Sequence, residues 1–227
     1  MYETNEKKPS LVVKNATFIT SAARAEQFIK PDKPMIAVCG KSNVGKSSFI
    51  NMLANKKKLA KTSSEPGRTR LVNYFDFGEF ILADLPGYGF ARVSKGEKDK
   101  WAKTLDQFFK NKGDIAHVFM LADSRHDPTA DDVQMMQFLH YHTLPFTVVL
   151  TKADKLSRMK LKEHIKAIAS DLYLGVENLL ATSAETGYGK NDVLGKIRVV
   201  IDNVKETSYE DEEGEESEED EEVETEE

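Results

Sequence analysis

A glycine-rich loop at residues 40–47, with the sequence GKSNVGKS, limits the folds that are open to this chain. The apolar run MIAVC at residues 35–39 precedes it, and the helix-forming sequence SSFINML follows it. A strand that enters such a loop and leaves it as a helix is typical of a P-loop. There, backbone N–H groups converge on phosphate and the helix contributes its positive N-terminal end. The loop therefore predicts phosphate binding within an α/β fold.

Each fixed position of the pattern G-x-x-x-x-G-K-[ST] has a physical role. We expect Lys46 to reach the β- and γ-phosphates of a nucleotide and the Ser47 hydroxyl to bind Mg²⁺. The residues expected to line the phosphates are Gly40, Lys41, Ser42, Asn43, Val44, Gly45, Lys46, Ser47 and Ser48. The pattern alone leaves ATPases, GTPases and small-molecule kinases open.

Short apolar runs alternate with longer amphipathic ones along the rest of the chain. The runs at 35–39, 71–77, 80–85, 116–122, 146–151 and 176–181 predict strands, and those at 46–55, 98–110, 129–142, 160–171 and 189–204 predict helices. The alternation indicates an α/β fold with a mostly parallel six-stranded sheet and helices on both faces. A tight turn at residues 77–80 predicts one antiparallel edge strand.

Charge divides the chain into unequal parts. Residues 206–227 hold 15 of the 38 acidic residues and no basic one, which leaves 23 acidic and 32 basic residues in the rest, a net charge of +9. We expect a disordered acidic tail at 206–227, because such a segment repels itself and buries little apolar surface. The tail either competes with RNA for the basic body or only solubilises it. The remaining parts are a domain at 34–205 and an N-terminal extension at 1–33 that packs on it.

Cysteine content and hydropathy favour a cytoplasmic protein. Cys39 is the only cysteine, and its apolar surroundings predict a small buried side chain rather than a reactive thiol. No run approaches the roughly 18 apolar residues that a membrane helix needs. The first ten residues have no apolar segment of the kind found in signal peptides.

The sequence TKAD at 151–154 indicates which base is bound. The Asp154 carboxylate can accept hydrogen bonds from N1–H and the N2 amine of guanine, whereas adenine would leave it unpaired. The Lys152 stem can lie along the base, and TSA at 182–184 can close over it with backbone N–H groups. The residues expected at the base are Thr151, Lys152, Ala153, Asp154, Thr182, Ser183 and Ala184.

Two further segments have the character of nucleotide switches. Asp84 ends a predicted strand in the sequence DLPG, where it can hold Mg²⁺ through water while the Gly87 N–H contacts a γ-phosphate. The loop SSEPGRTR at 63–70 places Thr69 as a second Mg²⁺ ligand. Such loops order on the γ-phosphate and relax when it leaves. We also expect Gly67, Arg68, Leu85 and Pro86 to border the nucleotide.

The ordered motifs GKSNVGKSSFIN, PGRTR, DLPGYGFA, TKAD and TSA resemble the EngB (YihA or YsxC) family of bacterial ribosome-biogenesis GTP-binding proteins. The resemblance covers roughly residues 15–205, and PGRTR with DLPGYGFA is its most specific part. It implies a Ras-like GTPase domain, GTP hydrolysis with Mg²⁺ and a role in assembling the large ribosomal subunit. The acidic tail is not part of the family pattern. Thr151 stands where many GTPases have asparagine, which removes an amide that would brace the base loop.

The sequence offers several candidates for the catalytic group. Tyr88 follows the switch glycine where many GTPases have glutamine, and a phenol is a poor general base at neutral pH. We therefore expect slow intrinsic hydrolysis. Asn43 either holds a K⁺, as the matching residue does in some relatives, or satisfies its own loop. Arg68 and Arg70 either assist catalysis or contact RNA. The expected catalytic set is Lys46, Thr69, Gly87 and Asn43.

Clustered cations indicate a polyanionic partner. The clusters are Lys56, Lys57, Lys58 and Lys61; Arg92, Lys95, Lys98, Lys100 and Lys103; and Lys155, Arg158, Lys160, Lys162 and Lys166. With the resemblance, they favour ribosomal RNA of the large subunit, with no DNA or membrane partner and a monomer away from the ribosome. The alternatives are a guanine-nucleotide-gated RNA-binding module with negligible hydrolysis and a GTPase with a protein partner.

Overall fold

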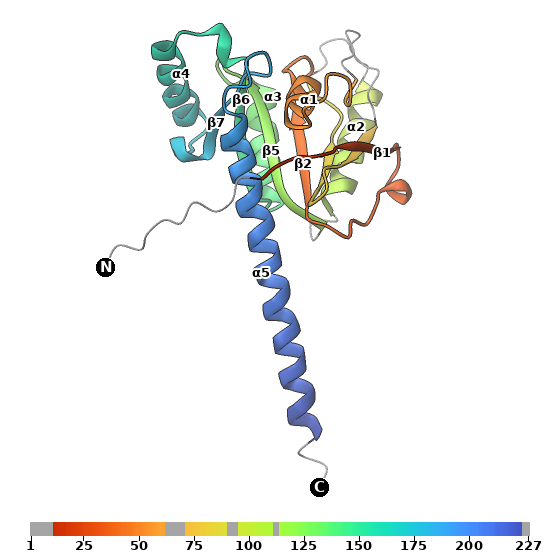
Figure 1. Ribbon diagram of the computed structural model, residues 1–227. Helices are drawn as coiled ribbons and strands as arrows, with labels where there is room; N and C mark the ends of the chain where they lie inside the picture. The colour runs from red at the N-terminus through yellow and green to blue at the C-terminus, as the bar shows by residue number, and fades with distance from the viewer. Residues whose placement is uncertain (1–10, 62–70, 90–94, 111–113, 224–227) are drawn as a thin grey trace, which may run out of the picture.

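The computed structural model describes residues 11–61, 71–89, 95–110 and 114–223. One seven-stranded sheet has the spatial order β1-β3-β4-β2-β5-β6-β7 (Figure 1). Its strands are β1 (Thr17–Ala22), β2 (Met35–Gly40), β3 (Val72–Asp76), β4 (Ile81–Asp84), β5 (Ile115–Asp123), β6 (Phe146–Thr151) and β7 (Leu179–Ala181). The helices are α1 (Lys46–Leu53), α2 (Lys95–Lys110), α3 (Ala130–Tyr141), α4 (Arg158–Asp171) and α5 (Lys190–Val223). The α/β class and the mostly parallel sheet are confirmed.

The sheet has one strand more than the sequence predicts. Strands β4, β2, β5, β6 and β7 pair in parallel, and β3 is antiparallel to β4. The antiparallel strand is not at the edge, because β1 pairs with β3 on its outer side. β1 lies in the segment expected to be an extension, where the only helix among the described residues is the single 3-10 turn η1 (Ala25–Gln27).

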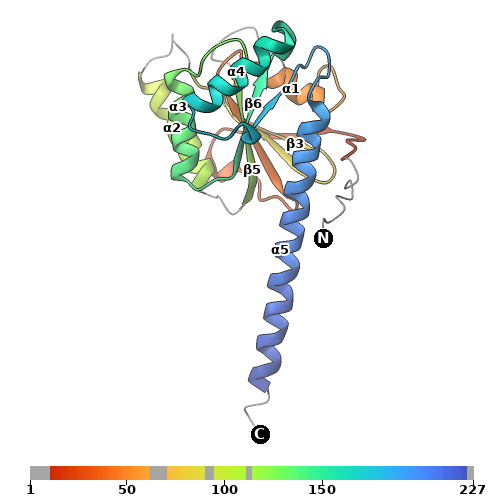
Figure 2. The same cartoon turned by 90° about the vertical axis from the view of Figure 1, so that its left-hand side faces the viewer.

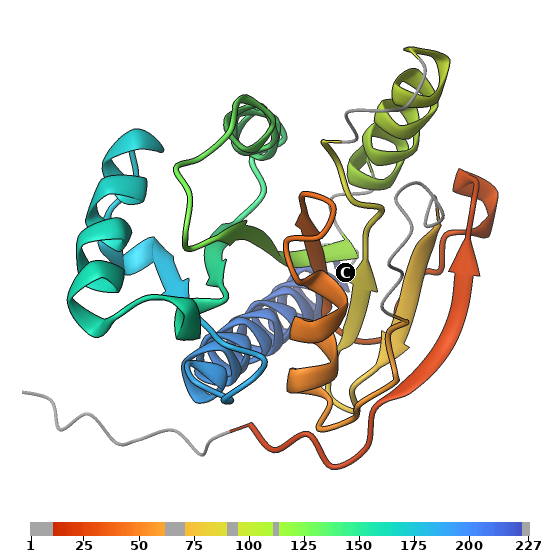
Figure 3. The same ribbon diagram turned by 90° about the horizontal axis from the view of Figure 1, so that it is seen from above.

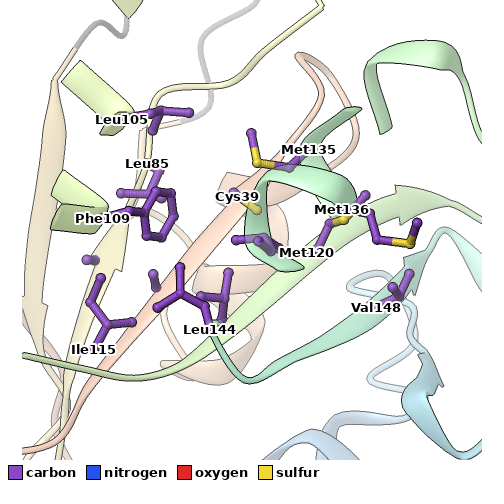
Figure 4. Close-up of a cluster of buried hydrophobic side chains, with 14 of the residues drawn as sticks. Cys39, Leu85, Leu105, Phe109, Ile115, Met120, Met135, Met136, Leu144 and Val148 are labelled. Atoms are coloured by element: carbon purple, nitrogen blue, oxygen red, sulfur yellow. The ribbon is translucent and has the colours of Figure 1, made fainter. Parts of the chain in front are cut away.

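Helices cover both faces of the sheet (Figure 3). Alternate residues of β2 point to opposite faces, so that Ala37 and Cys39 join one cluster of buried side chains while Ile36 and Val38 join the other. The first cluster receives α2, α3 and α4, and Figure 4 shows part of it around Cys39 and Met120. The second receives α1, α5 and residues 11–16 of the N-terminal segment.

Cys39 lies inside the first cluster and is 1% exposed. Burial raises the pKa of its thiol to about 12, so the thiolate is disfavoured at neutral pH. The expectation of a small buried side chain is confirmed.

Helix α5 runs on into the segment for which the sequence predicts a disordered tail. The helix continues without a break to Val223, and its last part projects away from the sheet (Figures 1 and 2). Glutamate is a good helix former, and a helix that already exists is extended at little cost, whereas a new nucleus is costly. The disorder expected from repulsion among the carboxylates stays a prediction.

None of the helices in the described ranges is both long enough and apolar enough to cross a membrane.

Candidate functional site

Five loops follow parallel strands and therefore meet at one edge of the sheet, and four of them hold residues of the predicted site. They follow β2, β4, β5, β6 and β7, and the carboxyl ends of parallel strands are where α/β proteins bind ligands. The P-loop (residues 40–47) is the central one and leads into α1. Asn43 and Gly45 both have left-handed backbone, with φ of 64° and 109°. Such turns in front of a helix make a concave array of N–H groups that suits an anion.

Lys46, the first residue of α1, faces the end of β4. Its ammonium forms an ion pair with the Asp84 carboxylate, and the two side chains are 12% and 5% exposed. The Asn73 amide on β3 lies 3.4 Å from the same carboxylate. The structure thus brings the predicted phosphate-binding lysine and the predicted metal-facing carboxylate into direct contact.

The donor set at this point fits Mg²⁺. The Ser47 hydroxyl in the first turn of α1 and the Asp84 carboxylate at the end of β4 are hard oxygen ligands, which Mg²⁺ prefers. The part of the chain that the structure describes has no group of three or more His, Cys, Asp or Glu side chains able to hold a metal. Magnesium in a site of this kind takes its remaining ligands from substrate phosphates and water.

The base loop (residues 151–154) is braced against the P-loop by Thr151. The Thr151 hydroxyl lies 2.6 Å from the Val44 carbonyl oxygen and 3.2 Å from that of Ala122. Because a hydroxyl has one proton, we assign its donated bond to Val44, the shorter contact. The threonine therefore links β6 to the P-loop although it lacks the amide of asparagine.

Lys152 makes a second link between these loops. Its ammonium donates to the backbone oxygen of Asn43 and to the Asp123 carboxylate, both at 2.9 Å. Arg125 also binds Asp123, through Nε at 2.9 Å and Nη2 at 2.8 Å. Burial opposes the charged form of Asp123, but the bonds from Arg125 and Lys152 outweigh it and hold the pKa of the carboxyl far below its usual range. Asp123 therefore remains a carboxylate that anchors the lysine.

Asp154 is kept ionised by its own neighbours. Lys155 lies 2.8 Å from one carboxylate oxygen, and the Ser183 hydroxyl donates to the other at 2.6 Å. These bonds hold the pKa of the Asp154 carboxyl below its usual value. A carboxylate fixed in this way is a strong acceptor for paired N–H donors.

The closing loop (residues 182–184) differs from the expectation. The backbone N–H of Thr182 donates to the Leu150 carbonyl at 2.7 Å, and that of Ser183 donates to the Tyr188 carbonyl at 3.0 Å. Both groups belong to the turn itself, so they do not close over a base. Within the described ranges the Ala184 N–H has no acceptor, and it is the one that remains for a ligand.

The switch II corner (residues 84–87) is held against the P-loop by the residue that follows it. Tyr88 donates from its N–H to the Gly40 carbonyl at 3.3 Å, and its own carbonyl accepts from the Ser42 N–H at 2.9 Å. Its side chain is buried, and its hydroxyl donates to Asp132 at 2.8 Å. Burial raises the pKa of the phenol far above its ordinary value, and the Asp132 charge raises it further. The phenol is therefore built into the core and does not face the nucleotide site.

Asp132 connects this corner to α3. Its other carboxylate oxygen accepts from the backbone N–H of Thr129 at 2.9 Å and from the Thr129 hydroxyl at 2.6 Å, which caps the helix. The Lys41 ammonium of the P-loop lies 3.4 Å from that hydroxyl. The P-loop, the switch II corner and the first turn of α3 thus share one hydrogen-bond network.

Replacing Tyr88 with phenylalanine separates the structural role of the hydroxyl from a catalytic one. We expect Tyr88→Phe to lower the free energy of unfolding by about 1–3 kcal/mol, because a buried hydrogen bond to a charged acceptor is lost. Its rate of GTP hydrolysis should stay within about threefold of wild type. Denaturant titration and a phosphate-release assay measure the two quantities. A hydrolysis rate lowered a hundredfold at unchanged stability would mean that the phenol reaches the nucleotide.

Most of the predicted residues meet at this edge of the sheet. The P-loop, residues 84–87, the base loop and the closing loop are all described, whereas Gly67, Arg68 and Thr69 lie outside the described residues. Sequence reasoning missed Asp123 and Asp132. Asp123 could have been found, because it ends a strand next to the P-loop strand, where ligand-binding residues gather. Asp132 reads as an ordinary helix-capping residue.

A family model described as "50S ribosome-binding GTPase" matches residues 35–152. A probable GTP-binding protein EngB of Pelotomaculum thermopropionicum is 47% identical over 184 residues, which are 80% of this chain and 93% of the relative. The protein of the same description from Bacillus subtilis is 41% identical over 191 residues, 83% of this chain and 98% of the relative.

Solved structures agree in fold. A crystal structure of a probable GTP-binding protein EngB superposes with a TM-score of 0.63 at 24% identity, covering 74% of this chain and 99% of the other. Era in complex with MgGDPNP and nucleotides 1506–1542 of 16S ribosomal RNA superposes with a TM-score of 0.59 at 22% identity, covering 72% and 55%. With the sequence relatives and the arrangement of the loops, these matches show that the chain belongs to the EngB family of GTP-binding proteins, within the GTPases.

Proposed function

We propose that this chain hydrolyses GTP to GDP and phosphate and acts as a nucleotide-switched assembly factor for the large ribosomal subunit. The observation that carries the proposal is the bracing of the base loop on the P-loop through Thr151 and Lys152. It holds a carboxylate suited to guanine and a lysine suited to phosphates in one unit. The description of the matching family, which names the 50S ribosome, supports the ribosomal part.

In this proposal each loop has one task. Lys46 would bind the β- and γ-phosphates, and Ser47, Thr69 and Asp84 would hold Mg²⁺, Asp84 through water. When bound, Mg²⁺ would offset charge on the phosphates. Gly87 offers its N–H to the γ-phosphate, and Asp154 selects guanine while the Ala184 N–H contacts the base. Contact between Lys46 and Asp84 must give way when a nucleotide enters, because both face the same place.

Hydrolysis needs a group other than the Tyr88 phenol, which is buried and bound to Asp132. Asn43 is an exposed P-loop residue in left-handed backbone. Its backbone carbonyl oxygen accepts a hydrogen bond from the Lys152 ammonium. Its side-chain amide makes no hydrogen bond to any described residue. This favours a ligand role over the alternative that the amide satisfies its own loop. We therefore place K⁺ at Asn43, where a monovalent cation would offset charge on the phosphates in the way an arginine finger does.

The K⁺ proposed at Asn43 leads to a specific prediction about the rate of GTP hydrolysis. Replacing Na⁺ with K⁺ should raise the rate of GTP hydrolysis at least about tenfold, and Asn43→Ala should abolish that increment while binding GDP normally. Phosphate release at constant ionic strength measures the rates. If wild type is indifferent to K⁺, the cation is excluded. If hydrolysis is also undetectable, the chain is a guanine-nucleotide-gated RNA-binding module instead.

The charge of the chain supports an RNA partner. The part outside the acidic tail carries +9, and phosphate contacts from lysine and arginine give affinity without sequence readout. Of the cluster after α1, Lys57 and Lys58 are exposed, whereas Lys56 donates to the Asn15 side chain and the Ala16 carbonyl. In the cluster around α2, Arg92 lies outside the described residues. The solved structure of Era contains nucleotides of 16S ribosomal RNA, and this binding is an observation on Era and not on the present chain.

Sedimentation with ribosomal particles tests the proposed function. We expect the full chain to sediment with large-subunit particles when it holds a non-hydrolysable GTP analogue and to release them with GDP. Small-subunit particles serve as the control. Equal sedimentation with both particles, or no dependence on the nucleotide, would contradict the assembly role.

A further inference from the structure

Helix α4 presents an outer face that the fold itself does not use. Leu161, Ile168 and Ala169 turn inward and are buried, and Ile168 and Ala169 belong to the first cluster under the sheet. The helix begins after Ser157, which caps it and lies three residues after Asp154 of the base loop. It stands at the β7 end of the sheet, away from α1 and α2 (Figure 1). The outer face is therefore rigidly attached to the base loop and distant from the elements that adjoin the switches.

Three cations form a line along one flank of this face. Arg158, Lys162 and Lys166 are all exposed and follow one another at intervals of four residues. Residues at this spacing lie above one another on a helix, about 6 Å apart. Lys160 is also exposed, but its place in the helical repeat puts it on the opposite flank. We call Arg158, Lys162 and Lys166 the α4 stripe.

The stripe has no anionic partner in the described part of the molecule. None of its three cations forms an ion pair with a described residue. Other cations are paired, as Lys33 is with Asp76 and Lys152 with Asp123. The stripe therefore offers charge that the fold does not neutralise.

An exposed aromatic side chain lies just past the C-terminal end of α4. Tyr173 lies two residues beyond the end of α4, directly after the capping residue Leu172, and it is 94% exposed. Its backbone is held in the left-handed region, with φ of 54°, and its N–H donates to the Ser170 carbonyl at 3.1 Å. Because the Tyr173 ring is almost fully exposed, it contributes little to packing of the fold. It can receive an unpaired base, because stacking on aromatic side chains is the usual mode of single-strand recognition.

We propose that the α4 stripe and Tyr173 form an RNA-binding face for an unpaired segment. The backbone phosphates lie along Arg158, Lys162 and Lys166, and one base stacks on Tyr173. The inference rests on the proposed function and adds to it the place and the kind of RNA. Since α4 adjoins the base loop rather than the switches, this contact contributes affinity that is the same with GDP and with GTP.

Charge reversal and ring removal test the two parts separately. The variants are Lys162→Glu/Lys166→Glu and Tyr173→Ala, and the probe is a labelled, unstructured RNA of about 20 nucleotides, long enough to span a site of the usual size. Matched controls are Lys14→Glu/Lys196→Glu, which makes the same charge change at exposed sites away from α4, and Tyr141→Ala, which removes another exposed ring. Unchanged GDP affinity checks that each variant is folded.

We expect the charge reversal to weaken RNA binding at least about tenfold and to lower the slope of log K against log salt by about 1.4, because two phosphate contacts are lost. Tyr173→Ala should weaken binding at least about fivefold at unchanged slope, and a fully paired RNA hairpin should not respond to it. Both effects should be equal with GDP and with a GTP analogue.

The inference is overturned if the stripe variants bind the RNA as their controls do. It is also overturned if they bind RNA normally yet no longer sediment with large-subunit particles, since the face would then take an acidic protein. These outcomes leave wild-type sedimentation, and with it the proposed function, intact. Nucleotide-independent sedimentation of the wild type would instead remove the proposed function.

Discussion

Asp154→Asn is expected to weaken GDP and GTP binding by at least about 100-fold. The substitution replaces a charged acceptor of two guanine N–H groups with an amide that offers one oxygen and one donor. Two hydrogen bonds to a charged group are together worth about 3–6 kcal/mol, which corresponds to roughly 100-fold to 10,000-fold in affinity. Ser183 and Lys155 remain beside the new side chain, so the loop keeps its position.

The same variant should bind xanthine nucleotides more tightly than wild type does. Xanthine carries an oxygen at C2, which can accept from the introduced amide where guanine would present a second donor. Calorimetric titration with GDP and XDP measures the exchange of preference, and wild type is the control. If the variant loses affinity for GDP and does not gain affinity for XDP, the substitution has unfolded the loop rather than changed its specificity.

Gly189→Ala is expected to destabilise the domain by at least about 3 kcal/mol, because an alanine there must adopt left-handed backbone and also displace the end of β7. Gly189 precedes α5 with φ of +71°, and a Cβ there would lie 1.9 Å from the Ala181 carbonyl oxygen. The melting temperature should fall by roughly 6–12 °C for a domain of this size. GDP affinity should fall as well, because Ala181 leads into the closing loop.

Gly195→Ala is the matched control, since it makes the same change in the same helix. Gly195 lies inside α5, and a Cβ there meets nothing within 4 Å. Alanine in a helix interior is favoured over glycine by about 0.5–1 kcal/mol, so this variant should be slightly more stable than wild type. Thermal melting of both variants gives the comparison. Equal stability of the two would contradict the close packing of Gly189 on β7.

The sequence predicts the parts of this fold that depend on local pattern. The loop at 40–47, the alternation of apolar and amphipathic runs and the order of the motifs are all local, and they place four of the loops of the site at one edge of the sheet. Local pattern does not assign β1 firmly, because its strand character depends on pairing with β3, which lies far along the chain. The extension of α5 depends on a balance between helix propensity and charge repulsion that composition alone does not settle.

The contacts that hold the site together are not predictable from the sequence either. The network from Tyr88 through Asp132 and Thr129 to Lys41 joins three loops, and each member alone reads as a capping or surface residue. The backbone N–H groups of the closing loop have partners that only the folded turn supplies. Residue identity predicts which ligand a loop suits. Tertiary structure decides which of its polar groups remain for that ligand.

Nucleotide binding by the wild-type chain decides whether the site is a guanine-nucleotide site. Calorimetric titration in the presence of Mg²⁺ would compare GDP, a non-hydrolysable GTP analogue and ADP. We expect GDP and the analogue each to bind at a single site on the chain, and ADP to bind at least about 100-fold more weakly, because adenine leaves Asp154 unpaired. Binding of ADP with the affinity of GDP would contradict the assignment of the base loop and, with it, the account of this site.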